Sequence, residues 1–332
     1  MRPSVTGPLF ALASFGVFAS HDAVVKLLGG TYSPFQLIFF SVLFGLPLAM
    51  FMLLRDSHPG TLRPVHPWWS ALRTFTVMTT GVAGFYAFST LPLAQVYALL
   101  FASPLFVTML SIPILGETVG RHRWAAVLVG LVGVFVVLRP WSADQVLSLG
   151  HAAALIAAAG SALSAVIMRR VARAERGVVL MLIPMLANFI VMGALMPWVY
   201  KPMPVADLGW MAVIAGFGFI AGLLMIAAYR RADAAIVAPM HYSQIIWAAI
   251  FGAAFFDETP DVMTWIGAAI IIASGIYVVV RESTGASDNA PVLRTRPRPE
   301  TGTSPRVVAA LRRRAEPPPP GHEALARRRA SE

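Results

Sequence analysis

Long apolar runs fill most of this chain, and no other feature limits its fold so strongly. A helix needs about 20 residues to cross about 30 Å of hydrocarbon. Ten runs come near that length, at 8–28, 34–54, 68–90, 92–115, 123–139, 149–170, 177–199, 208–229, 233–256 and 262–281. Of the 332 residues, 57% are hydrophobic and only 13% are charged, whereas a soluble domain carries about 25% charged residues. We therefore predict an all-α integral membrane protein with ten transmembrane helices.

One pattern occurs twice in the chain, once in each half. Glu117 is followed by threonine and then by Trp124, and in the second half Glu258 is followed by threonine and then by Trp265. The glutamates and the tryptophans are separated by the same length of chain, and an internal repeat of this length indicates a duplicated structural unit. Each half contains five apolar runs. Because five is an odd number, the second half is expected to lie inverted in the membrane relative to the first.

Composition divides the chain into three predicted parts. Residues 1–140 form a first five-helix repeat, residues 141–282 a second, and residues 283–332 a disordered, basic tail rich in Pro and Arg. The tail holds ten Arg and five acidic residues, so its own net charge is half of the +10 of the whole chain. It has too little apolar surface to fold. Contact with anionic lipid is its alternative role. Since the remaining charge lies in short loops, we expect no nucleic-acid partner.

The basic residues between the runs predict the orientation in the membrane. If the N-terminus is cytoplasmic, the outside loops hold only Arg139 and Lys201. The inside loops then hold Arg55, Arg63, Arg121, Arg123, Arg169, Arg170, Arg173, Arg176, Arg230 and Arg231. Positive charge collects on the cytoplasmic side of membrane proteins. We therefore predict a multi-pass protein of the cell inner (cytoplasmic) membrane with both termini in the cytoplasm.

Several segments resemble the EamA-type repeat of the drug/metabolite transporter superfamily. The first copy is carried by residues 22–28, 85–95, 101–106, 116–118 and 123–134, and the second by 228–235, 242–244, 256–261 and 272–277. The resemblance implies two inverted five-helix EamA-type repeats around a central cavity, and transport of small metabolites. Carriers for S-adenosylmethionine and riboflavin uptake look most similar, so riboflavin, S-adenosylmethionine and amino-acid-like metabolites are the expected substrates. One position departs from the related pattern, where Ser41 replaces an arginine.

Two ionisable residues in the first run are candidate site residues. Asp22 and Lys26 are four residues apart, so they share a helix face and are able to pair. Ionisable groups inside a membrane usually face a cavity or a partner. Two interpretations stay open, which are a structural ion pair and a substrate or proton site. His21 is interpreted as a core histidine.

The ninth run carries a second set of candidates. His241 and Gln244 lie at helical spacing on one face, and Gln244 is the repeat equivalent of Ser103 in the fourth run. Amide and aromatic groups suit a flat ligand that forms hydrogen bonds, although hydrogen bonding between helices is the alternative. The predicted substrate-binding residues are Asp22, Lys26, Tyr86, Ser103, His241, Tyr242, Gln244 and Trp247.

These features predict a secondary transporter that works by alternating access at a midplane site between the repeats. We expect the protein to bind a small-molecule substrate and to lie in the lipid bilayer, either alone or as a homodimer. We expect no cofactor and no catalytic or metal site. Glu117 and Glu258, at the ends of runs, are interpreted as capping or gating residues. The alternative is a membrane-embedded enzyme acting on lipid or isoprenoid. That interpretation would need a cluster of acids or histidines with catalytic geometry, which the sequence does not display.

Overall fold

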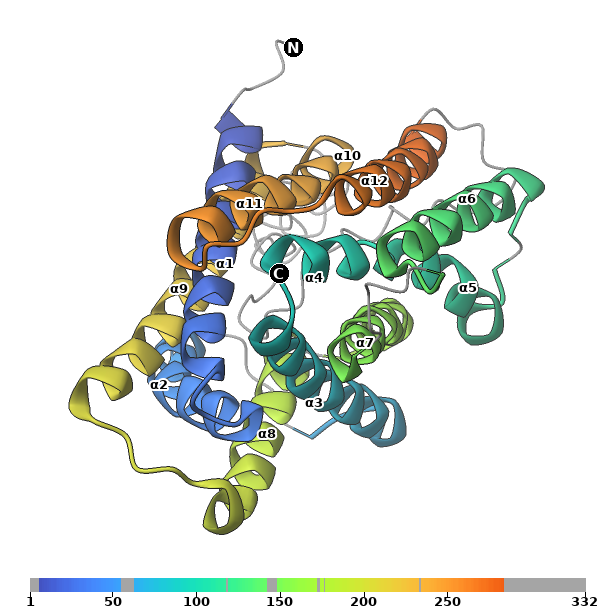
Figure 1. Ribbon diagram of the computed structural model, residues 1–332. Helices are drawn as coiled ribbons and strands as arrows, with labels where there is room; N and C mark the ends of the chain where they lie inside the picture. Colours follow the sequence, from blue (N-terminus) through green and yellow to red (C-terminus); the bar gives the residue numbers. More distant parts are fainter. Residues whose placement is uncertain are drawn as a thin grey trace, which may run out of the picture.

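The computed structural model describes residues 6–54, 63–117, 119–141, 148–171, 174–175, 177–232 and 234–283. All regular elements in these ranges are helices (Figure 1). They are α1 (Thr6–Gly29), α2 (Pro34–Leu54), α3 (Pro67–Thr90), α4 (Leu93–Leu100), α5 (Ser103–Leu115), α6 (Arg121–Leu138), α7 (Leu149–Val171), α8 (Gly177–Val199), α9 (Val205–Arg231), α10 (Ala234–Val237), the 3₁₀ helix η1 (Ala238–Ser243), α11 (Gln244–Phe255) and α12 (Val262–Ser283). The predicted tail, apart from its first residue, lies outside the described residues.

Seven of the described helices are long and apolar enough to cross a membrane, and Pro34–Met50 is a shorter apolar helix. The seven are α1, the joined α4 and α5 (Leu93–Leu115), α6, α7, α8, α9 and α12. Three predicted spans are not among the seven, and α2 is one of them because its apolar part is short. The segment α3 is more polar and contains the buried Arg73, whose Nη1 donates a hydrogen bond to the Leu180 carbonyl of α8. The ninth run is divided into α10, η1 and α11. A multi-helix membrane protein is thus confirmed, while the count of ten spans stays a prediction.

Two helix starts in the first half recur in the second half at the spacing that separates Glu117 from Glu258. Ser103 begins α5, and its repeat equivalent Gln244 begins α11. Arg121 begins α6, and Val262, at the same spacing, begins α12. The fourth run of each half is therefore interrupted at the equivalent position. The break before α5 is followed by Pro104, which lacks the N–H that would continue the preceding turn.

The same spacing holds for two unusual backbone conformations. Gly116 follows α5 with φ of 69°, and Asp257 follows α11 with φ of 53°. Left-handed backbone suits Gly and is tolerated by Asp better than by most residues. Both residues direct the chain so that the following glutamate, Glu117 or Glu258, turns back toward the helix bundle.

The two halves of the chain interlock. The helix α1 packs along α9, α3 along α7, α2 against α8, and α6 along α12 (Figure 1). Every one of these pairs joins a helix of the first half to a helix of the second half. The pair α6 and α12 approaches closely because Gly133 and Gly267 face each other, since a Cβ on Gly267 would lie 2.7 Å from the Gly133 carbonyl oxygen. Small residues allow such contacts between membrane helices.

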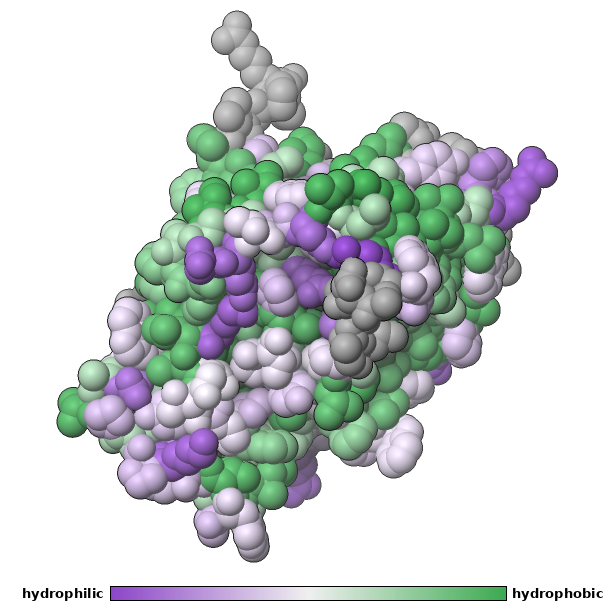
Figure 2. Space-filling model, viewed as in Figure 1, coloured by the Kyte–Doolittle hydropathy of each residue, from purple (hydrophilic) through white to green (hydrophobic). Residues whose placement is uncertain are grey.

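The core lies around α4, and apolar side chains also cover the outside. Residues Leu93 to Leu99 of α4 are all buried, and α4 lies amid the other helices (Figure 1). On the outer face of α6, Leu128, Val132 and Phe135 are exposed. Figure 2 shows apolar residues over much of one face of the molecule. An exposed apolar surface of this extent is what contact with lipid requires.

Candidate functional site

Asp22, in the second half of α1, lies at the centre of a hydrogen-bond network. Its Oδ1 is 2.7 Å from His21 Nδ1, and its Oδ2 accepts a hydrogen bond from the Tyr97 hydroxyl of α4. Tyr97 also hydrogen bonds with Gln244 of α11. The network therefore connects one helix of the second half to two helices of the first. Asp22 and Lys26, which share a face of α1 as expected, do not pair with each other.

Lys26 pairs instead with Glu258, and we call these two residues the Lys26 pair. Its Nζ is 2.6 Å from Glu258 Oε1 and donates a second hydrogen bond, of 2.6 Å, to the Leu91 carbonyl. Glu258 Oε2 accepts a 3.1 Å hydrogen bond from the Leu93 N–H. Leu91 follows the end of α3 and Leu93 begins α4. A cation thus meets a helix C-terminus and a carboxylate meets a helix N-terminus, which is the favourable arrangement for both helix dipoles.

Glu117 pairs with Arg169 near the end of α7, and we call these two residues the Arg169 pair. Arg169 Nη2 donates a hydrogen bond to Glu117 Oε1. The next residue, Arg170, donates to the Ile114 carbonyl and lies 4.7 Å from the centre of the Trp69 ring. Within the described part of the chain, Glu117 Oε2 and the Nε and Nη1 atoms of Arg169 are buried without a hydrogen-bond partner.

The two ion pairs are equivalent in the repeat and lie at opposite ends of one membrane segment. Their glutamates occupy matching positions of the two copies, and each pair joins one half of the chain to the other. The segment Leu93–Leu115 begins at the Lys26 pair, through the Leu93 N–H, and ends just before Glu117. A continuous helix of its 23 residues would be roughly 35 Å long at 1.5 Å per residue. The sequence indicated a role for both glutamates but not their partners.

The remaining candidates lie around this network. His241 and Tyr242 of η1 pack against the Phe101 ring, with centroid distances of 5.3 Å and 5.1 Å. Gln244 is buried. These three residues and Asp22 are joined through Tyr97, whose ring centroid is 6.3 Å from that of Phe101. Tyr97, like Tyr86, was only a weaker candidate in the sequence, and it was not included among the predicted substrate-binding residues.

Three predicted residues make separate contacts. Ser103 Oγ lies 2.9 Å from Ser161 Oγ of α7. Tyr86 of α3 is half-buried against the core. The Trp247 indole lies over Gly16 of α1, where an added Cβ would be 3.2 Å from the ring. These residues hold helices together and do not touch the Asp22 network.

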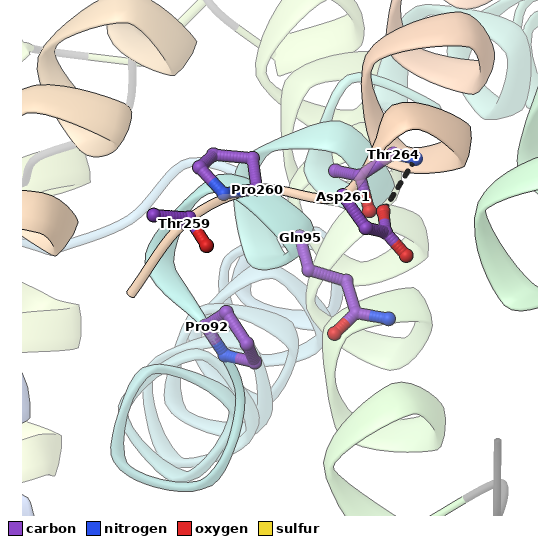
Figure 3. A pocket seen from close by; sticks show the side chains of 6 residues that line it. All are labelled: Pro92, Gln95, Thr259, Pro260, Asp261 and Thr264. Atoms are coloured by element: carbon purple, nitrogen blue, oxygen red, sulfur yellow. Dashed lines mark hydrogen bonds between the residues drawn. The ribbon is translucent and has the colours of Figure 1, made fainter. Parts of the chain in front are cut away.

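A small cavity of about 220 Å³ (Figure 3) is lined partly by Pro92 and Thr259, which adjoin in sequence the residues that contact or form the Lys26 pair. Its lining is formed by the start of α4 and by the turn before α12, through Pro92, Gln95, Thr259, Pro260, Asp261 and Thr264. Gln95 Nε2 is 3.1 Å from His151 Nε2, and Asp261 Oδ1 accepts a 2.7 Å hydrogen bond from the Thr264 N–H. Ligand pockets usually measure about 300–1,000 Å³. We therefore interpret this cavity as a gap in the packing and not as the substrate site.

Comparison with known proteins identifies the class to which this helical bundle belongs. Residues 5–139 and 148–281 both match the EamA-like transporter family. These two segments make up most of the chain, so the protein belongs to that family, which is part of the drug/metabolite transporter superfamily. The resemblance inferred from the sequence is thereby confirmed.

Similar proteins of this family carry several different names. The chain is 23% identical to an S-adenosylmethionine uptake transporter of Rickettsia bellii over 81% of this chain and 91% of the relative. It is 30% identical to a riboflavin transporter of Vibrio cholerae over 65% of this chain and 72% of the relative. It is 25% identical to the pseudopaline exporter CntI of Pseudomonas aeruginosa over 82% and 95%, respectively. A solved structure, 19% identical, shares the fold with a TM-score of 0.56 over 84% of this chain and 96% of the other.

Proposed function

We propose that the protein is a secondary transporter that moves a small metabolite across the cytoplasmic membrane by alternating access. The observation that carries the proposal is the pairing of Lys26 with Glu258 at one end of the bundle and of Arg169 with Glu117 at the other. Each ion pair ties one half of the chain to the other half. Breaking one pair at a time would open one end while the opposite end stays closed, with the Asp22 network between the two ends.

The proposal includes two inverted halves, residues 1–140 and 141–282, with five spans each. Contacts between chain segments support it. Tyr32, after α1, donates a 2.6 Å hydrogen bond to Asp207 at the start of α9, and the Gln36 amide donates a 2.8 Å bond to the Lys201 carbonyl. Both contacts join segments that are predicted to lie on the outer side of the membrane. At the predicted cytoplasmic side, the His66 N–H donates a 2.6 Å hydrogen bond to Glu175. Segments assigned to one side therefore meet each other.

The proposed site lies between the halves and contains Asp22, Tyr97 and Gln244, with the rings of Phe101, His241 and Tyr242 next to them. Carboxylate, hydroxyl and amide groups beside aromatic rings suit a small metabolite with polar groups and a flat part. The names of the relatives support this class, because S-adenosylmethionine and riboflavin both contain flat ring systems. A further relative is named as an exporter of pseudopaline. The family and these names indicate transport and not catalysis.

Flux into proteoliposomes tests the proposal. Purified full-length protein would be reconstituted and offered riboflavin, S-adenosylmethionine and a panel of amino acids in labelled form. We expect saturable flux for at least one compound, and loss of that flux in Gln244→Ala, which removes the amide that reaches Tyr97. The matched control is Asn188→Ala, in which an amide of α8 away from the network is removed. Absence of saturable flux for every compound, in vesicles that hold correctly folded protein, would contradict the proposal.

A further inference from the structure

Asp22 differs from the three carboxylates that form ion pairs between helices, and from Asp207 and Glu175, whose contacts lie at or beyond helix ends. Glu258 pairs with Lys26, Glu117 with Arg169 and Asp261 with Arg139. Among the described residues, no Lys or Arg pairs with Asp22, whose contacts are the His21 ring and the Tyr97 hydroxyl. We propose that Asp22 binds a positively charged organic group of the transported metabolite, either a protonated amine or an onium centre. This inference rests on the proposed transport function.

The position of Asp22 makes a missing counter-charge significant. Asp22 lies nearly two turns before Gly29, where α1 ends, which is about 10 Å along the helix axis, and its side chain is only 15% exposed. An ionised carboxylate at this depth is costly unless a cation compensates it. The Tyr97 hydroxyl donates a hydrogen bond without cancelling the charge. The His21 ring, whose Nδ1 lies 2.7 Å from the carboxylate, cancels it only when the ring is protonated. A bound cation would cancel it.

Lys26 is not free to supply that charge. It lies one turn from Asp22 on the same helix, but its ammonium group is already bound to Glu258 and to the Leu91 carbonyl. Glu258 in turn is fixed by the Leu93 N–H. The lysine is thus directed toward the end of the bundle, and the carboxylate of Asp22 is left for a ligand.

The surroundings of Asp22 favour an organic cation over a metal ion. No group of three or more His, Asp or Glu side chains in the described ranges is placed to hold a metal. Aromatic rings are close instead. The His21 ring is 6.0 Å from Phe85, and the Tyr97 ring is 5.5 Å from Phe88. Aromatic faces attract ammonium and other onium cations.

A ligand at Asp22 would act on both halves of the transporter. Asp22 belongs to α1, and its partner Tyr97 belongs to α4 and contacts Gln244 of α11. When the ligand draws the carboxylate toward itself, the Tyr97 and Gln244 contacts adjust with it. The charge of the substrate is therefore placed where it can favour one arrangement of the halves over the other.

Ligand-dependent melting of the purified full-length protein tests this inference without a transport assay. The probes are phenethylamine and tryptamine, each compared with the alcohol of the same carbon skeleton, phenethyl alcohol and tryptophol. We expect each amine to raise the melting temperature in a saturable manner and each alcohol to leave it unchanged. Asp22→Asn should lower the apparent affinity for the amines about tenfold or more, equivalent to about 1.4 kcal/mol, whereas Asp22→Glu should keep it.

Asp207→Asn is the matched control, because Asp207 also accepts a hydrogen bond from a tyrosine hydroxyl, that of Tyr32, but lies at a helix end. It should leave the amine effect intact. Equal shifts from amines and alcohols, the absence of any shift, or an amine shift that persists in Asp22→Asn would overturn the inference. A shift produced only by lowering the pH and lost in Asp22→Asn would identify the proton as the ligand and would overturn it as well.

Failure of this inference can be told apart from failure of the proposed function. Saturable flux that is unchanged in Asp22→Asn would leave the transporter intact and reject the role of Asp22. Amine binding that depends on Asp22, without flux of any compound, would reject the transport function instead.

Discussion

The Lys26 pair and the Arg169 pair occupy equivalent positions in the two halves, but their polar atoms are bonded to different degrees. In the Lys26 pair, the lysine has two acceptors and both oxygens of Glu258 have a donor. In the Arg169 pair, within the residues described, one oxygen of Glu117 and two nitrogens of Arg169 have no partner. A buried polar group without a partner costs about 1–3 kcal/mol. The duplicated scaffold therefore holds its two ends with unequal strength.

This inequality predicts which end opens more easily. The end that holds the Arg169 pair is the one that the loop charges predict to face the cytoplasm. Because its bonds are fewer, it should separate with less free energy than the end closed by the Lys26 pair. We therefore expect the empty protein to open preferentially toward the cytoplasm.

The largest effect is expected when the Lys26 pair is broken. Glu258→Ala removes the counter-charge of Lys26 and the acceptor of the Leu93 N–H, so the free energy of unfolding should fall by about 3 kcal/mol, near the lower end of the range for a broken buried pair because both groups are partly exposed. Denaturant or thermal unfolding in detergent measures this. The exchange Lys26→Glu with Glu258→Lys should recover part of the loss. No recovery would show that attraction between the two charges is not the stabilising interaction.

A smaller effect is expected at the Arg169 pair. Glu117→Ala should lower the free energy of unfolding by only about 1 kcal/mol, since this pair already holds unpartnered groups. Measured alongside Glu258→Ala under identical conditions, the variant tests the comparison directly. A loss equal to or larger than that of Glu258→Ala would show that the two ends are held equally well.

Chemical labelling should reveal the same difference between the two ends, measured as the accessibility of an introduced thiol. The chain contains no cysteine, so Ser103→Cys provides a single thiol at the start of α5. Adding Glu117→Gln should raise the rate of labelling from the cytoplasmic side roughly fivefold, the effect of about 1 kcal/mol. Glu258→Gln, the matched change at the other end, should not raise it. If both changes raise cytoplasmic labelling equally, the two pairs do not control separate ends.

The smallest effect is expected for a contact that belongs to neither pair. Tyr32→Phe removes one hydrogen bond to Asp207 and should lower the free energy of unfolding by less than Glu117→Ala does, because no ion pair is broken. It should also leave the labelling of Ser103→Cys unchanged. Unfolding measured side by side for the two variants checks the order of the effects, and a loss in Tyr32→Phe that exceeds the loss in Glu117→Ala would contradict it.

The same hydrogen bond should depend on pH in a defined direction. The bond to Asp207, together with burial, raises the pKa of Tyr32 to about 12. The stabilisation should therefore be complete below the ordinary tyrosine pKa of about 10 and be lost as the pH rises through about 12. Unfolding of the wild type and of Tyr32→Phe, compared across the pH range, measures this. A difference between the two proteins that already changes between about pH 6 and about pH 9 would contradict the assignment.

Local pattern in the sequence predicted an all-helical membrane protein and its repeat, but not the partners of charged residues. The spacing of Glu117 and Glu258 foretold equivalent positions, because duplication preserves spacing. Asp22 and Lys26 looked like a pair at one helical turn apart, yet Lys26 binds a glutamate from the other half of the chain. A contact across so long a stretch of chain depends on how helices pack, and one sequence does not record that packing.

The ninth run shows a second limit. His241 and Gln244 were placed on one face by assuming an α-helix, whereas His241 lies in the 3₁₀ helix η1, a helix type with three residues per turn. Side chains three residues apart eclipse in a 3₁₀ helix, so His241 and Gln244 still share a face. His241 and its neighbour Tyr242 each contact Phe101. Pro239 and Pro104 were visible near both breaks, so the interruptions could have been anticipated from the sequence, although not the helix type that replaced the regular turn.

The central claim is that the two ion pairs close opposite faces of the membrane, and the sidedness of two turns tests it most directly. Ala174→Cys, between α7 and α8, and Ala206→Cys, at the start of α9, are each exposed single-thiol positions. With a maleimide that does not cross membranes, Ala206→Cys should react in intact cells, and Ala174→Cys should react only after the membrane is opened. Reaction of both positions from the same side would contradict the inverted arrangement and the mechanism built on it.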